Sequence, residues 1–272
     1  MLKIKIKKSF IILSTTLLFF SSFLNSIKAE TKEEKLKKLF TAIQIKHLKE
    51  YKLAFENIKT SEDFANTYHK ALLLKEELSE TINKEYQKIK TDIPSEKEFK
   101  WLEEYTPSMN IRLVAEATEL DLMLNYIPFQ KKAKSTLQKE DDMFINLMID
   151  VYGERETFFA KWFKQTWDYG GCSHLGKGLH NKNLTDINNI YEKSKFFKKD
   201  LQEIKEKIFK DLLKNNFYCE TKDSVIKEIK QIIQNSNIPK EEKSKLENRI
   251  KELKKVKKDI YFDCNTKDCP YG

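Results

Sequence analysis

The 272-residue sequence has little glycine, proline or arginine: 6 Gly, 5 Pro and three arginines among its 51 basic residues. The low glycine content excludes collagen, which needs glycine at every third position. A strand-rich sandwich or barrel is disfavoured, because such folds need frequent turns and this chain has few turn residues. Nucleic-acid binding is also disfavoured, because binders of that class concentrate arginine and lysine on one face. Charged residues are abundant instead, at 34%, against about 25% in a typical domain.

Long apolar runs are missing beyond residue 29, and the only one lies at the N-terminus. Residues 1–29 combine four early lysines, an apolar run from Phe10 to Leu24 and Ala29 as the residue before a cleavage site, which predicts a secretory signal peptide. The alternative is an uncleaved single-span anchor, which is disfavoured because the run of about 15 residues falls short of the ~20 that a spanning helix needs. No cysteine lies near the cleavage site, so lipoprotein anchoring is not expected. We therefore expect a soluble periplasmic or secreted protein, whose net charge falls from +9 to +4 on cleavage.

Apolar residues recur every three or four positions through most of the remaining chain, the pattern of amphipathic helices. Helices are expected over residues 31–57, 60–94, 95–107, 109–127 and 139–167, the last one kinked at Gly153. The expected fold class is all-α: an irregular multi-helix bundle with one Gly-rich irregular loop and a C-terminal antiparallel helical hairpin, residues 186–262. Residues 30–272 are expected to form a single helical domain; a subdivision near residues 181–186 is the alternative.

The C-terminal third carries two short apolar seams, each about two heptads long, which indicates short coiled-coil-like helices. Their residues are Phe197, Leu201, Ile204 and Ile208, then Leu246, Ile250 and Leu253. Residues 239–258 hold nine basic residues and four glutamates. This segment could contact an anionic membrane surface, or it could present a solvated lysine face.

The segment 109–127 is read as the most apolar helix, so its few charged groups must pair or line a cavity. At 100° per residue, Arg112, Glu116 and Glu119 fall within a sector of about 60°. One interpretation is an Arg112–Glu116 ion pair at i,i+4. The other places Glu116 and Glu119 in a ligand pocket as catalytic acid and base.

Five of the six glycines lie between residues 153 and 178, and residues 153–180 also hold two of the three tryptophans and two of the four histidines. Such glycines are needed where φ is positive or where backbone approaches another group closely. Gly170 and Gly171, followed by Gly176 and Gly178, could form an anion-binding nest of backbone amides. Three aromatic residues could stack on a ligand or could belong to the core; they are Trp162, Trp167 and Tyr169.

Metal-ligand residue types also gather in this segment: Asp168, Cys172, His174 and His180. Their spacing matches no zinc signature, so no metal or other cofactor is expected, and His174 and His180 are the candidate ligands if one binds. A thiol nucleophile at Cys172, with a neighbouring histidine as base, requires that cysteine to be free. The structural alternative is that Cys172 fastens the loop to a helix end near Cys219.

Four cysteines in an exported chain predict two disulfides. The favoured pairing is Cys172–Cys219 with Cys264–Cys269, because the six-residue C-terminal segment can close as a tight loop. The alternative joins Cys219 to one of the C-terminal pair.

No complete catalytic constellation is visible, so the first hypothesis is a non-enzymatic binding or interaction protein of the bacterial cell envelope. Its partner would be an unidentified protein or small ligand. One alternative is a periplasmic hydrolase, with acid and base groups drawn from Glu116, Glu119, Asp168, His174 and His180. A metal-binding protein is the other.

Overall fold

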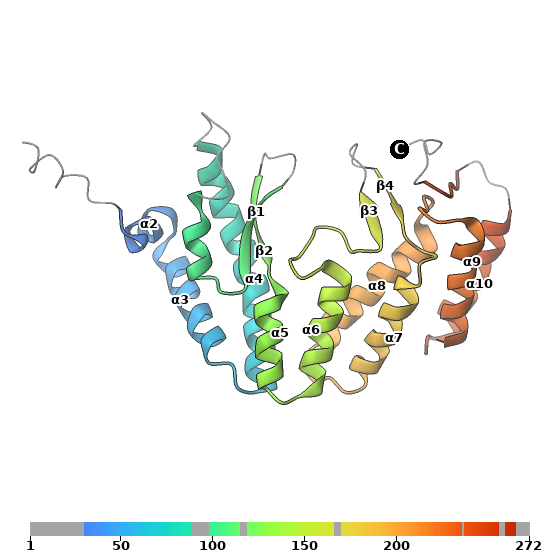
Figure 1. Cartoon of the computed structure of the whole chain (residues 1–272), viewed down its shortest axis with the longest axis horizontal. Coiled ribbons are helices and arrows are strands. Elements are labelled where there is room, and N and C mark those ends of the chain that lie inside the picture. The colour runs from blue at the N-terminus through green and yellow to red at the C-terminus, as the bar shows by residue number, and fades with distance from the viewer. Residues whose placement is uncertain are drawn as a thin grey trace, which may run out of the picture. The chain divides into compact units, whose positions relative to one another are not determined.

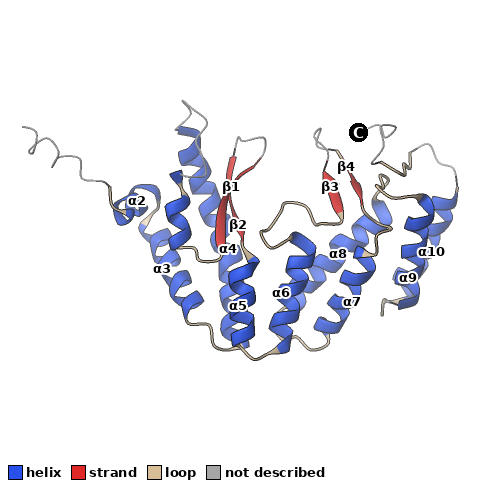
Figure 2. Ribbon diagram, viewed as in Figure 1, coloured by secondary structure: helices blue, strands red, loops and turns tan. Residues whose placement is uncertain are grey.

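The computed structural model describes residues 30–88, 98–114, 119–165, 170–235, 237–255 and 259–264. The protein is predominantly helical, with 66% helix and two small antiparallel sheets (Figures 1 and 2). The all-α expectation is therefore wrong in its strict form. The chain divides into two compact units, residues 1–45 and 46–272, each considered by itself below. The expected signal peptide lies outside the described residues, and among the described helices none is long and apolar enough to cross a bilayer.

The first unit contains α2 (Lys32–Leu39) and the start of α3 (Ala42–Glu56). Helix α2 begins with a capping box: Thr31 Oγ1 accepts from the Glu34 amide at 3.2 Å, and the Glu34 carboxylate accepts from the Thr31 amide at 2.8 Å. Two amides that the first helical turn leaves unpaired are satisfied in this way. The sequence Thr-Lys-Glu-Glu thus fixes where the helix starts.

An aromatic core holds the first half of the second unit together. Four helices meet around it: α4 (Ser61–Lys88), α5 (Tyr126–Ser135), α6 (Lys139–Tyr152) and α8 (Lys198–Lys214). The rings of Phe144 and Phe197 stack at 3.9 Å, Tyr68 meets Phe144 edge-on at 5.1 Å, and Phe64 meets Phe129 at 5.8 Å. All five rings are buried. Edge-to-face and offset-stacked pairs of this kind add to the free energy of burial.

The helix expected over residues 109–127 is wrong: residues 109–114 and 119–124 form two paired strands. Strands β1 (Met109–Val114) and β2 (Glu119–Leu124) pair antiparallel with Arg112 opposite Asp121. Leu120, Leu122 and Leu124 are fully buried, and β2 packs on α4. These leucines recur at every second position, the strand period, and the apolar content of the segment concealed that period.

Backbone amides on the outer edge of β2 donate to side chains of α4 rather than to a third strand. The Leu120 amide donates to Asn83 Oδ1 at 2.7 Å, and the Leu122 amide donates to Ser79 Oγ at 3.1 Å. Both acceptors lie on α4, one helical turn apart. An edge that would otherwise attract another strand is thereby covered by the helix.

Two further helices are shorter than expected. Only a 3₁₀ helix, η2 (Lys100–Glu104), lies between residue 98 and Pro107. The α6 helix ends at Gly153, with φ of 94°, and it does not resume. Residues 154–162 are an irregular loop leading to β3 (Phe163–Gln165), which pairs antiparallel with β4 (Gly171–Ser173).

Three further helices join α8 in the C-terminal part of the described chain: α7 (Leu179–Tyr191), α9 (Lys222–Asn235) and α10 (Lys240–Lys254). Helix α7 packs on α8 and α9, and α10 packs on both α8 and α9. The residues predicted to form the two apolar seams, including Leu201, Ile204 and Leu246, are buried. Residues 181–186 lie inside α7. The expected hairpin is therefore one part of a packed group of helices, which places the glycine segment against α8 and α9.

Candidate functional site

A disulfide fastens the glycine segment. Cys172 on β4 is bonded to Cys219, with an S–S distance of 1.98 Å and Cα atoms 5.1 Å apart, which confirms the first of the two favoured disulfides. None of the described cysteines is free, so the hypotheses of a thiol nucleophile or a metal ligand at Cys172 are wrong. The expected partner of Cys264, Cys269, lies outside the described residues. Backbone bonds extend the connection, since the Ser173 carbonyl accepts from the Cys219 amide at 2.8 Å.

Two of the four glycines expected to form a nest, Gly176 and Gly178, do so together with Asn181, and a carboxylate of the protein occupies it. Glu228 on α9 accepts from the amides of Gly176 at 2.5 Å, Gly178 at 2.9 Å and Asn181 at 3.1 Å. Gly176 and Gly178 have φ of 117° and 84°, values that favour glycine. Gly178 is the N-cap of α7, where the helix dipole favours an anion. The carboxylate is only 1% exposed, so this anion site is filled internally.

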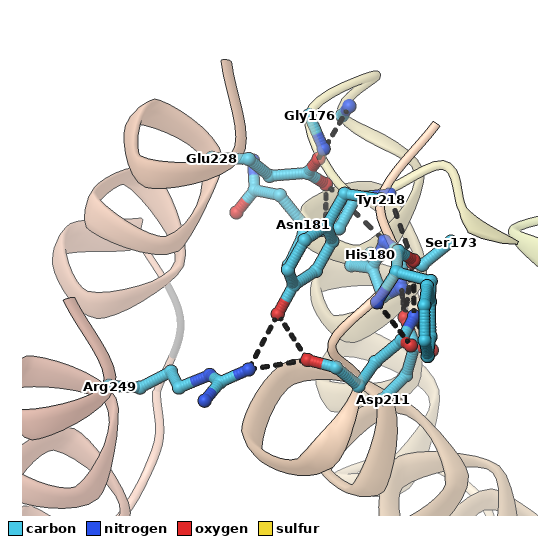
Figure 3. Close-up of polar contacts among 12 residues, drawn as sticks. Ser173, Gly176, His180, Asn181, Asp211, Tyr218, Glu228 and Arg249 are labelled. Carbon is cyan, nitrogen blue, oxygen red and sulfur yellow. Dashed lines mark hydrogen bonds and ion pairs between the residues drawn. The ribbon is translucent and has the colours of Figure 1, made fainter. Parts of the chain in front are cut away.

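His180 lies beside this nest, fully buried (Figure 3). Its Nε2 is 2.8 Å from Asp211 Oδ2 on α8, and its Nδ1 is 3.9 Å from Glu228 Oε1. The ring lies 5.5 Å from that of Trp162, which is 4% exposed. Ser173 Oγ donates to the same Asp211 oxygen at 2.5 Å. The polar cluster of Ser173, His180, Asp211 and Glu228 therefore connects β4, α7, α8 and α9.

The order of these groups is unsuited to nucleophilic catalysis. In a Ser-His-acid triad the imidazole lies between the hydroxyl and the carboxylate and removes the hydroxyl proton. Here the Asp211 carboxylate accepts from both Ser173 and His180, and both side chains are fully buried. The cluster stabilises the packing of four elements rather than presenting a base to solvent.

Arg249 on α10 extends the polar contacts to the last helix. Its guanidinium donates to the Asn215 carbonyl, to Asn216 Oδ1 at 3.0 Å and to the Tyr218 hydroxyl at 3.0 Å, as Figure 3 shows in part. Burial raises the pKa of Tyr218, and the neighbouring guanidinium offsets part of that effect. The phenol therefore stays protonated and donates to the Asn215 carbonyl at 2.7 Å.

A second buried carboxyl lies at the start of α6. Asp141 is fully buried, Ser61 Oγ donates to its Oδ1 at 2.6 Å, and Thr136 Oγ1 lies 2.6 Å from its Oδ2. Burial raises the pKa of Asp141, the two hydroxyls oppose that shift, and neighbouring Glu140 adds to it. The residue borders a polar hollow of about 490 Å³ and was not predicted from the sequence.

The other predicted site residues are dispersed. His174 is half-buried, with its Nδ1 3.0 Å from Glu220 Oε1. Gly170 is half-buried, and Gly171 begins β4, where a Cβ would lie 2.5 Å from the Lys164 carbonyl oxygen. Glu119 is exposed at the start of β2, so the helical sector that grouped it with Arg112 does not exist. Four predicted residues lie outside the described part: Glu116, Trp167, Asp168 and Tyr169. No group of three or more potential ligands that could hold a metal ion occurs within the described ranges.

The sequence did not predict the most exposed aromatic side chains among the described residues. Phe158 and Phe159, on the loop between α6 and β3 (Figure 1), are 57% and 44% exposed. Thr157 fixes this loop by donating to the Phe159 carbonyl at 2.7 Å. Both phenylalanines line a cavity of about 400 Å³ together with Trp162 and the lysines of α8, which we call the aromatic hollow. The sequence signal was two adjacent phenylalanines, which the helical interpretation placed within the helix expected over residues 139–167.

Comparisons with protein-family models, curated proteins and solved structures give no match for this chain. The interpretation therefore depends on the geometry itself. Two features border one another: a buried polar cluster beneath the disulfide, and the aromatic hollow. Asp211 belongs to both.

Proposed function

We propose that the protein is a non-enzymatic binding protein of the bacterial cell envelope, exported by residues 1–29, and that its ligand occupies the aromatic hollow. The observation that carries the proposal is the exposure of Phe158 and Phe159 on a loop whose backbone is held in place. Burying one such side chain contributes about 1.5–3 kcal/mol. Two adjacent exposed rings therefore offer a ligand binding energy that the fold itself does not use.

The burial of the polar side chains supports a binding function over a catalytic one. Ser173, Glu228 and the Nε2 atom of His180 are all buried and hydrogen-bonded within the chain. A hydrolase built on this segment would need at least one of them in contact with solvent and substrate. What this region offers a ligand is aromatic surface instead, and the disulfide holds the adjoining strand in place.

The direct test is the binding of an uncharged fluorescent probe, N-phenylnaphthylamine, to the mature protein. We expect saturable binding that the double variant Phe158→Ala/Phe159→Ala loses. Leu53→Ala is the matched control, because Leu53 is 61% exposed on α3 and does not line the hollow. Equal binding by wild type and the phenylalanine variant would overturn the proposal.

Export is tested separately by fractionating expressing cells and sequencing the N-terminus of the recovered protein. We expect release from the cytoplasm and a first residue of Glu30. A chain that retains residues 1–29 in the membrane fraction would contradict cleavage and favour the anchored alternative, while leaving the hollow as the binding site.

A further inference from the structure

Three lysines of α8 line the aromatic hollow: Lys207, Lys210 and Lys214. Their spacing of three and four residues places them within about 60° on one face of the helix. The hollow therefore combines a stripe of positive charge with the aromatic surface of Phe158 and Phe159.

Little negative charge opposes this stripe. Asp211 is the acidic residue that lines the hollow, and its carboxylate already interacts with Ser173, His180 and Asn215. Lys207 is hydrogen-bonded to the Tyr152 hydroxyl at 2.9 Å, a neutral partner. Neither Lys210 nor Lys214 has an ion-pair partner within the described ranges. Two ammonium groups are thus left to interact with whatever enters the hollow.

We infer that the ligand is a small amphipathic anion: an aromatic or aliphatic body that packs on the phenylalanines, with one carboxylate, sulfonate or phosphate group facing Lys210 and Lys214. This inference rests on the proposed function and specifies its ligand class. A volume of about 400 Å³ is within the range of about 300–1,000 Å³ that small-molecule sites occupy. The lysine ammonium acts as a point charge and does not need a planar partner, so it can bind a carboxylate, a sulfonate or a phosphate. The two lysines therefore favour a ligand with an anionic group, and the phenylalanines favour one with an apolar body.

The test compares two probes that share one body and differ in charge, anilinonaphthalene sulfonate and the uncharged N-phenylnaphthylamine. We expect the sulfonate to bind about tenfold more tightly, the ratio expected from two exposed charge pairs. The charge-reversal variant Lys210→Glu/Lys214→Glu should abolish that preference and leave the uncharged probe unaffected. Lys199→Glu is the matched control, because Lys199 is 90% exposed on the same helix and lies outside the hollow.

The outcomes that would contradict the anion inference differ from those that would contradict the binding function. If both probes bind equally, or if the lysine variant keeps the preference, the anionic class is wrong and the binding function stands. If neither probe depends on Phe158 and Phe159, the proposed function itself is wrong. If the protein sediments with phosphatidylglycerol vesicles through the same residues, and no soluble probe binds saturably, the hollow contacts a membrane surface and the small-ligand inference is overturned.

Discussion

Replacing Glu228 with alanine tests whether the glycine segment is organised by its internal anion. The carboxylate is the acceptor for three backbone amides, those of Gly176, Gly178 and Asn181. The side chain that replaces it ends at Cβ and accepts nothing. The three donors at the start of α7 would then lose their partner in a buried place.

The expected loss follows from these contacts. A buried donor without an acceptor costs about 1–3 kcal/mol, and a carboxylate at a helix N-terminus contributes about 0.3–2 kcal/mol. Water that enters the vacated space restores part of the hydrogen bonding. We therefore expect Glu228→Ala to lower the free energy of unfolding by about 3–5 kcal/mol, a large share of the 5–15 kcal/mol that a typical domain has.

Urea denaturation followed by circular dichroism measures this change, provided the slope with urea stays constant. Glu241→Ala is the control, because Glu241 is exposed on α10 and pairs with Lys245 at 2.7 Å; it should leave the urea midpoint nearly unchanged, since exposed ion pairs contribute little to stability. Glu228→Gln should fall between the two, because one oxygen still accepts from the amides. Equal midpoints for Glu228→Ala and Glu241→Ala would refute the reasoning.

Three further changes have calculable outcomes. Since burial raises the pKa of Asp141, its contribution to stability is fullest below the unfolded pKa of about 3.8 and is lost as pH rises through the folded value. Asp141→Asn should therefore flatten the pH dependence of Tm and leave neutral-pH stability equal or higher; a lower Tm at neutral pH would contradict this. Cys172→Ala/Cys219→Ala opens a loop of 47 residues and should cost about 4 kcal/mol in urea denaturation, and an unchanged midpoint would argue against it. Phe144→Ala removes the ring stacked on Phe197 and should cost about 3–5 kcal/mol, with a loss below 1 kcal/mol as the contrary result.

The features that the sequence predicted correctly are local ones. In α8, apolar Leu201, Ile204 and Ile208 recur at helical spacing and are all buried. The concentration of glycines predicted a special backbone, and Gly176 and Gly178 adopt positive φ. The Cys172–Cys219 pairing was also correct. Each of these depends on residue type and spacing, which the sequence contains directly.

The errors arose where a distant partner decides the structure. Residues 109–124 are apolar enough for either a helix or strands, and in the hairpin Arg112 and Asp121 lie opposite one another. What stabilises the strands is α4, whose Ser79 and Asn83 accept from the β2 amides. Those contacts span about 40 residues of sequence, so no local pattern could reveal them.

The same reasoning explains why we propose the aromatic hollow, and not the glycine nest, as the binding site. The nest has the geometry of an anion site, but Glu228 already occupies it. Because a buried carboxylate without donors would be costly, Glu228 and the amides need one another. Its occupant comes from 50 residues further along the chain, which the glycine pattern does not show. With the amides, His180 Nε2 and Ser173 bonded inside the protein, the groups that the described part of the segment and α8 present at the hollow are Phe158, Phe159 and the neighbouring lysines. The polar residues of the segment account for its shape, and under the proposed function the exposed phenylalanines supply the surface on which a ligand packs.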